Sequence, residues 1–126
     1  MVTMFRQKGW LLGIAILLGS LATHAQEEDA KLSQFFKTYL EERFQREPLF
    51  ATRLGDHRFD DQLDDLSPEA RRRNIEFARE TLRRLPKEIA YERLSRSSQI
   101  DFEILEHELE TGLWIDEHLR PFETDP

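Results

Sequence analysis

The stretch KLSQFFKTYLEERF, from Lys31 to Phe44, decides the fold class of this chain. Its apolar and aromatic residues recur at intervals of three and four positions, at Leu32, Phe35, Phe36, Tyr39, Leu40 and Phe44. A helix turns once in about 3.6 residues, so this spacing places all of them on one stripe. The stretch predicts an amphipathic α-helix over about residues 30–46, whose apolar face has to be buried against other elements.

A shorter helical piece is expected immediately downstream. Pro48 ends the first helix or starts the next, and residues 49–54 are long enough for one or two further turns. Gly55 is well placed to adopt the left-handed conformation that closes many helices. The aspartate-rich stretch that follows is predicted to be a loop.

The second long helix is predicted to begin at Ser67-Pro68. The serine oxygen can accept a hydrogen bond from a first-turn backbone amide that has no partner within the helix. Proline is tolerated in this turn because the N–H that it lacks would have no helical partner there. The buried stripe of this helix is expected at Ile75, Ala78, Leu82 and Leu85, and Pro86 is expected to stop it. The connection around Tyr91 is predicted to add a short helix.

The third long helix is predicted from a capping box, Ser98 to Asp101. The buried residues of this helix are expected at helical spacing, with further apolar residues broadening the same face: Phe102, Leu105, Leu109 and Leu113, then Ile100, Ile104 and Trp114. The pattern fades near Glu117. No run alternates with a period of two, so we expect an all-α fold, a helical bundle or array of three long helices plus one or two short ones.

The first 25 residues have the pattern of a secretory signal peptide. Arg6 and Lys8 precede an uncharged run that ends in small residues at Ala25. The strongly apolar part, residues 10–22, is 13 residues long, whereas a membrane-spanning helix needs roughly 20. Cleavage after Ala25 leaves residues 26–126, which places the product in the periplasm or outside the cell, in contact with membrane only before cleavage. An uncleaved N-terminal anchor is the alternative.

Composition limits the chain to one modest domain. There is no cysteine, and 34 of the 101 residues after the predicted cleavage site are apolar or aromatic, fewer than globular domains usually carry. Losing Arg6 and Lys8 changes the net charge from −7 to −9, which makes the chain a poor nucleic-acid ligand. An arginine cluster, residues 71–73, 79, 83 and 84, has glutamates at helical spacing and is interpreted as a face of surface ion pairs.

One helix motif is close to a zinc site. His107 to Thr111 reads HELET, whereas a His-Glu-x-x-His helix uses two imidazoles for zinc and the glutamate as general base. Threonine replaces the second histidine, so His107 is interpreted as an ordinary surface or half-buried residue. No serine, cysteine or lysine has an adjacent base that would make it a nucleophile. From its residues alone the chain shows no complete catalytic site.

The acidic stretch GDHRFDDQLDDLSPEA, Gly55 to Ala70, raises the question of a cation site. A calcium loop of the EF-hand kind needs alternating acids, a glycine at the sixth position and a glutamate at the twelfth. Here the acids form doublets, Asp60-Asp61 and Asp64-Asp65, without an internal glycine. Because aspartate also accepts hydrogen bonds from nearby backbone amides, a turn is the preferred interpretation and a metal site the alternative.

The order of these features resembles the N-terminal part of the bacterial family called domain of unknown function 885. Members show a Pro-x-x-Ala-Thr-x-x-Gly segment, an aspartate-bearing turn, Ser-Pro-Glu and an Asp-x-x-Leu helix. The matching positions here are Pro48, Ala51, Thr52, Gly55, Asp60, Asp61, Ser67, Pro68, Glu69, Asp101 and Ile104 or Leu105. This resemblance covers nearly all of residues 30–126.

Full-length members are several times longer, mainly helical, and resemble zinc-dependent peptidases, with a His-Glu-x-x-Pro-Gly-His motif far downstream. The resemblance implies that residues 26–126 are the N-terminal helical segment of a larger, truncated domain. It implies zinc and a peptide substrate for the full-length relatives, no cofactor in this chain, and no activity of the chain alone. In that setting Asp60, Asp61, Asp64 and Asp65 are hypothesised to rim a substrate cleft.

A second interpretation is a complete small exported helical protein. It would bind a protein partner through the face that carries Phe35, Phe36 and Tyr39. The sequence leaves the oligomeric state open, and it leaves open whether the chain has any enzymatic activity.

Overall fold

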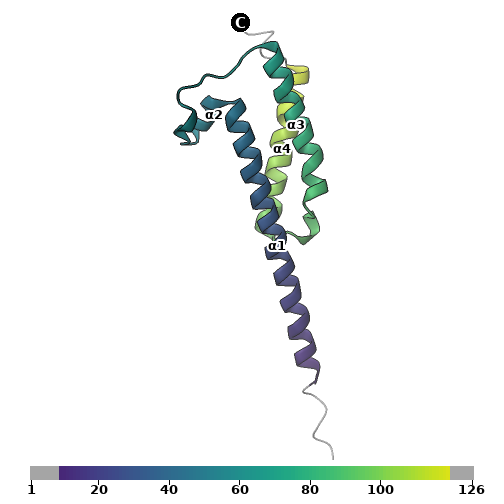
Figure 1. Ribbon diagram of the computed structural model, residues 1–126. Helices are drawn as coiled ribbons and strands as arrows, with labels where there is room; N and C mark the ends of the chain where they lie inside the picture. The colour runs from purple at the N-terminus through teal and green to yellow at the C-terminus, as the bar shows by residue number, and fades with distance from the viewer. Residues whose placement is uncertain (1–8, 120–126) are drawn as a thin grey trace, which may run out of the picture.

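The computed structural model describes the backbone of residues 9–119 and the side chains of residues 24–119. Its elements in chain order are α1 (Gly9–Arg46), α2 (Pro48–Arg53), the 3₁₀ helix η1 (His57–Phe59), α3 (Pro68–Glu88), the 3₁₀ helix η2 (Tyr91–Arg93) and α4 (Arg96–His118). No strand occurs between residues 9 and 119, so the expected all-α fold is confirmed. The three long helices and the short helices follow the predicted order (Figure 1).

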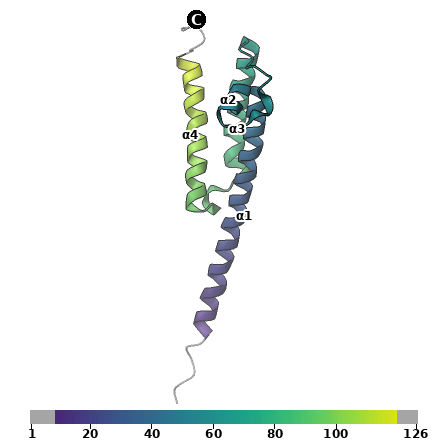
Figure 2. The ribbon, with the colours of Figure 1, turned by 90° about the vertical axis from the view of Figure 1, so that its left-hand side faces the viewer.

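The second half of α1 lies beside α3 and α4, while its first half extends beyond them (Figures 1 and 2). One core joins the three long helices with the α3–α4 connection, and its buried members are Leu32, Phe35, Tyr39, Leu85, Ile89, Leu94, Phe102, Leu105 and Leu109. Tyr39 and Phe77 stack across α1 and α3 with ring centroids 5.8 Å apart. Members of all three predicted stripes therefore meet in one core, although Ile75 and Leu113 are only partly buried and do not belong to it.

Two of the predicted helix ends have the expected geometry. The Ser67 hydroxyl accepts a hydrogen bond from the Ala70 amide at 3.1 Å, with Pro68 in the first turn of α3. Gly55 has φ of +88°, in the left-handed region that costs glycine little. The sequence interpretation of these two positions is confirmed.

Three predicted boundaries are wrong. The helix expected from about residue 30 begins at Gly9, because no proline interrupts residues 9–46 and the leucines and alanines among them favour a helix despite Gly13 and Gly19. Pro86 does not stop α3, since it lies in the last turn and the Ile89 amide still bonds the Leu85 carbonyl at 3.1 Å. The N-cap of α4 is Ser95, not Ser98, which lies inside the helix with its amide directed at the Ser95 hydroxyl.

The expected burial is wrong for part of α4. Ile100, Ile104 and Trp114 keep 42%, 59% and 53% of their surface exposed, because they lie opposite the face that carries Phe102 and Leu105. The face proposed for partner binding mainly serves the core. Phe35 and Tyr39 are buried and Phe36 packs partly against the core, so these three side chains stabilise the bundle. Binding of a protein partner stays a prediction.

Two acids of α1 hold the α3–α4 connection. Glu28, only 3% exposed, accepts a hydrogen bond from the Ala90 amide at 2.8 Å, and Asp29 accepts one from the Ser95 amide at 2.9 Å. The Ala90 hydrogen bond lowers the pKa of Glu28 more than burial raises it. Burial alone would raise the pKa of Asp29, but hydrogen bonds from Ser95 and Ser98 lower it overall. Both carboxylates therefore favour the folded chain in their charged form.

The predicted signal peptide falls mostly outside the described residues. Residues 1–8, and the side chains of residues 9–23, are not described, so the signal peptide stays a prediction. Within the described part, no helix combines the length and apolar character needed to cross a membrane. The predicted cleavage site after Ala25 lies inside α1, three residues before Glu28.

Candidate functional site

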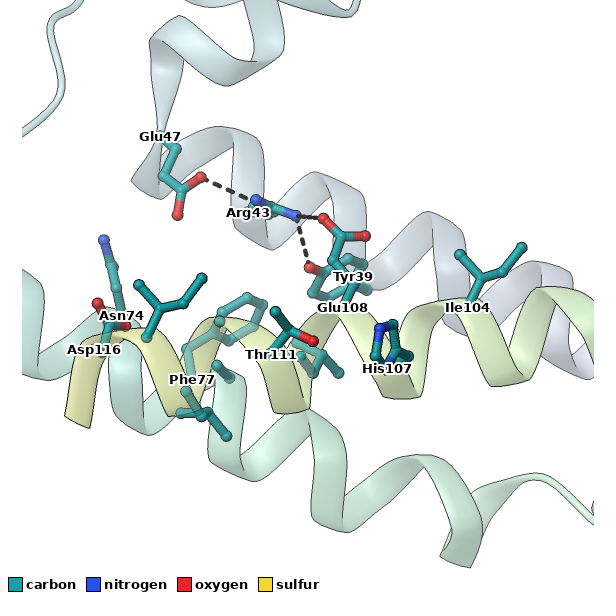
Figure 3. A pocket seen from close by; sticks show the side chains of 15 residues that line it. Tyr39, Arg43, Glu47, Asn74, Phe77, Ile104, His107, Glu108, Thr111 and Asp116 are labelled. Carbon is teal, nitrogen blue, oxygen red and sulfur yellow. Dashed lines mark hydrogen bonds and ion pairs between the residues drawn. The ribbon is translucent and has the colours of Figure 1, made fainter. Parts of the chain in front are cut away.

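An open groove of about 630 Å³ lies between α1, α3 and α4. Its apolar lining comes from Tyr39, Phe77, Ala78, Ile104, Leu109, Gly112, Leu113 and Ile115, and its polar lining from Arg43, Glu47, Asn74, His107, Glu108, Thr111 and Asp116. Figure 3 shows the labelled members of this set, with α4 running along one side of the groove. A mostly apolar hollow with a few convergent polar groups is the usual form of a binding site.

Arg43 organises the α1 side of the groove. Its guanidinium donates to the Tyr39 hydroxyl at 2.9 Å, to Glu47 at 3.2 Å and to Glu108 of α4 at 3.3 Å (Figure 3). It also lies 3.9 Å from the ring centre of Phe50. Burial alone would lower the pKa of Arg43, but its partners raise it overall, so the guanidinium stays charged. Arg43 therefore ties α1 to α4 and is already satisfied by its own chain.

Asp116 is a partly buried acid of the groove. Its side chain is half-buried, and burial raises the pKa of its carboxyl above the ordinary value. In the described part of the chain no hydrogen bond or ion pair reaches this carboxyl. A carboxylate in this position gains from a cation brought by a ligand.

His107 lies at the edge of the groove with an exposed side chain. The neighbouring Glu108, which would be the general base of a His-Glu-x-x-His motif, forms an ion pair with Arg43. Among residues 24–119 no group of three or more histidine, aspartate or glutamate side chains is arranged to hold a metal ion. The groove as described thus offers docking contacts without a metal centre.

The aspartates of the acidic stretch serve as hydrogen-bond acceptors for the loop itself. Asp60 accepts from the Thr52 hydroxyl at 2.7 Å and lies 2.9 Å from His57 Nδ1. Asp64 accepts from the Leu49 amide at 3.0 Å, and Asp65 accepts from the Ser67 amide at 2.9 Å. The Thr52 hydrogen bond lowers the pKa of Asp60, and the Ser67 amide lowers that of Asp65.

The structure does not bring the four predicted cleft-rim residues to the groove. Asp60, Asp61, Asp64 and Asp65 lie in the loop between α2 and α3, and none of them lines the groove. Asp61 is exposed, and the other three hold the loop against α2 and the start of α3. The hydrogen bonds support the turn interpretation, while a rim role in a full-length relative stays a prediction.

The arginine cluster on α3 forms the expected surface ion pairs. Arg72 pairs with Glu69 at 2.7 Å, Arg83 with Glu76 at 3.2 Å and also with Glu80. Arg79 reaches across to Glu117 of α4 at 2.9 Å, which the sequence spacing did not predict. These arginines therefore pair largely with acids of their own chain.

The sequence interpretation missed the groove and the two acids of α1. The groove depends on the angle and distance between helices far apart in the chain, which local spacing does not encode. Glu28 and Asp29 bond amides more than 60 positions away, and a local pattern contains no sign of such partners. Only the acid-rich start of the segment after Ala25 offered a signal, as acids favour the first turn of a helix.

Comparison with known proteins gives one match. A family model described as "Bacterial protein of unknown function (DUF885)" matches residues 48–125, which include α2, α3 and α4. No curated protein and no solved structure matches the chain. Because the match covers more than half of the chain, this chain belongs to the DUF885 family of bacterial proteins.

Proposed function

We propose that the chain is an exported helical scaffold of a zinc-dependent peptidase-like protein. In this role α1, α3 and α4 form one wall of a larger helical cleft, and the metal ligands come from polypeptide outside these helices. The groove along α4 carries the proposal, because most of its lining residues lie in the part of the chain that matches the family and it leaves apolar side chains open. The peptidase-like character itself comes from the resemblance of the family to such enzymes.

Within this proposal the chain supplies shape and docking surface, and no chemistry of its own. A His-Glu-x-x-Pro-Gly-His motif does not occur in this sequence. Glu108, in the most zinc-like motif that is present, is held by Arg43. Zinc and a peptide substrate are therefore proposed only for an assembled or full-length relative, with no nucleic-acid partner.

Export is part of the same proposal. Arg6 and Lys8 followed by an uncharged run support a signal peptide, with the product in the periplasm or outside the cell. The position of the cleavage site has further support from α1. Removal of residues 1–25 leaves Glu27, Glu28 and Asp29 in the first turn of the shortened helix, where negative charge is favourable.

A chimera tests the scaffold role. Residues 26–126 replace the corresponding N-terminal region of a full-length DUF885 protein that has the His-Glu-x-x-Pro-Gly-His motif, and zinc-dependent hydrolysis of a peptide mixture is measured. We expect the chimera to hydrolyse peptides, and the chain alone to give none with or without zinc. The matched control is the same chimera with the motif glutamate changed to glutamine.

Two results would contradict the scaffold role. The first is peptide hydrolysis by the chain alone, which would place the active site within it. The second is full activity of the relative after its N-terminal region is deleted, because a cleft wall cannot be dispensable.

A further inference from the structure

Helix α4 carries a second row of side chains opposite the core. Its members are Ile100, Ile104, His107, Thr111, Trp114 and His118, separated by four, three, four, three and four positions. This is the spacing of a coiled-coil seam, in which two positions of each heptad meet a partner helix. All six are exposed in the described structure, and the rings of Trp114 and His118 stack 4.7 Å apart.

The row is continuous with the groove. Ile104, His107 and Thr111 belong to the row and also line the groove, where Ile115 and Tyr39 extend the apolar surface toward α1. We call the row and the groove together the α4 surface. Its shape is an elongated strip along a helix with a hollow on one side, which suits another helix better than a compact small molecule.

The α4 surface is acidic along both margins. Residues 97–119 contain no lysine or arginine, and the row is flanked by Asp101 and Glu108 on one side and by Glu103, Glu110 and Glu117 on the other. Glu103, Glu108 and Glu117 pair with Arg96, Arg43 and Arg79, respectively. Within residues 24–119 no basic side chain forms an ion pair with Asp101, Glu110 or Asp116, so these three acids stay available to a partner.

This charge pattern selects the kind of partner. In a symmetric contact between two copies the same surface faces itself, so each acidic margin would meet acids. Like charges in that position destabilise a helix pair. A partner with basic flanks gains instead, because its cations meet Asp101, Glu110 and the partly desolvated Asp116.

We propose that the α4 surface docks an amphipathic helix whose apolar row is flanked by lysine or arginine. The inference rests on the proposed function, in which this helix belongs to the polypeptide that completes the peptidase-like cleft. The apolar residues of the docked helix pack on Ile104 and Trp114, and its cations lie along the acidic margins. The chain thus contributes a helix-binding face to the assembly.

Two designed peptides test the docking. Both are helices of four heptads with isoleucine and leucine in the seam; one has lysine and the other glutamate at the flanking positions. Binding to the full chain is followed by titration calorimetry at low and at high salt. We expect the lysine peptide to bind at least about tenfold more tightly than the glutamate peptide, and its advantage to shrink at high salt.

Four variants test how much the row and the acidic margins each contribute to peptide binding. Ile104→Lys should weaken the lysine peptide about tenfold or more, while Leu63→Lys, at an 83% exposed loop position, should leave its binding unchanged. Glu110→Lys should weaken the lysine peptide and strengthen the glutamate peptide, while Glu92→Lys in η2 should do neither. Circular dichroism of each variant verifies that the helices are intact.

The proposal is overturned if the two peptides bind equally, if neither binds at about 1 mM, or if Ile104→Lys has no effect. Self-association of the chain that Ile104→Lys abolishes would also overturn it, because the occupant would then be a second copy. The peptide-binding measurements do not depend on any hydrolytic activity. An active chimera without peptide docking removes this inference alone, and docking with an inactive chimera removes the peptidase role alone.

Discussion

At the scale of single residues, Glu28 links stability to pH. Its folded pKa lies below the ordinary value of 4.5, first because the Ala90 amide bonds its charged form. In acid the folded chain therefore binds fewer protons than the unfolded chain. The stability that the Glu28 carboxylate contributes is fully present above its ordinary pKa and is lost as the pH falls through its folded pKa. Between about pH 5 and pH 3, the wild type should lose more stability than Glu28→Gln.

The measurement is the free energy of unfolding in urea at several pH values, followed by circular dichroism. At pH 7 the Glu28→Gln variant should be less stable by about 1–2 kcal/mol, because a neutral amide oxygen is a weaker acceptor. Other acids with lowered pKa values act equally on both proteins, so their contribution cancels in the difference. If the free energies of unfolding of the wild type and of Glu28→Gln change in parallel with pH, the Glu28 contact with Ala90 has no role in stability.

Replacing either of two glycines by alanine should change the stability of the chain, with a loss at Gly55 and a gain at Gly112. Gly55 has φ of +88° and Gly112 lies inside α4, and an added Cβ would meet nothing within 4 Å at either position. Gly55→Ala should therefore cost about 1–2 kcal/mol through backbone strain alone. Gly112→Ala should stabilise the chain by about 0.5–1 kcal/mol, because alanine favours a helix. Chemical unfolding measures both, and a loss of stability at Gly112 would show that α4 needs that space.

At the scale of the helices, the caps fix where α3 and α4 begin. The Ser67 and Ser95 hydroxyls accept amide hydrogen bonds from the first turns of these helices. Each change to alanine should cost about 0.5–2 kcal/mol, which thermal unfolding can resolve. Ser33→Ala is the control, because Ser33 is exposed inside α1 and its hydroxyl donates to the Asp29 carbonyl of the same helix. Equal effects at all three serines would contradict the cap assignment.

The helices are also the scale at which the sequence was most informative. Apolar spacing predicted three long helices and most of their buried residues because a helix repeats every 3.6 residues whatever surrounds it. It failed for Ile104 and Trp114, since a helix with apolar residues on two faces does not reveal which face meets the core. The signal at Ser98 was misleading because a serine three positions earlier takes the cap. The groove needs the relative placement of α1 and α4, which no local pattern contains.

At the scale of the whole molecule, one fully buried residue joins the long helices. Leu85 of α3 has no exposed surface and belongs to the core that includes Leu32 of α1 and Phe102 of α4. Leu85→Ala should cost about 2–5 kcal/mol, a large part of the stability of a small domain. Leu63→Ala, at an exposed loop position, should cost less than about 0.5 kcal/mol. Similar urea midpoints for the two variants would show that the helices do not share one core.

The N-terminal boundary of the folded unit should lie between residues 26 and 30. Two truncated chains that begin at these positions should therefore differ in thermal stability. Residues 26–126 keep Glu28 and Asp29, the two carboxylates that hold the Ala90 and Ser95 amides. Residues 30–126 lose both, and each charge-assisted hydrogen bond contributes about 1.5–3 kcal/mol. Residues 26–126 should therefore unfold near the temperature of the full chain, since the start of α1 extends beyond the bundle (Figure 1).

The shorter chain should unfold at least about 10 °C lower, because a loss of 1 kcal/mol shifts the midpoint of a domain of this size by about 4–8 °C. Thermal unfolding by circular dichroism compares the three chains under identical conditions, and the double variant Glu28→Gln with Asp29→Asn in residues 26–126 is the control for losing helix length. If the double variant is as unstable as residues 30–126, the two carboxylates account for the boundary. If residues 26–126 and 30–126 unfold together, α1 does not close the α3–α4 connection, and the link between the cleavage site and the fold is lost.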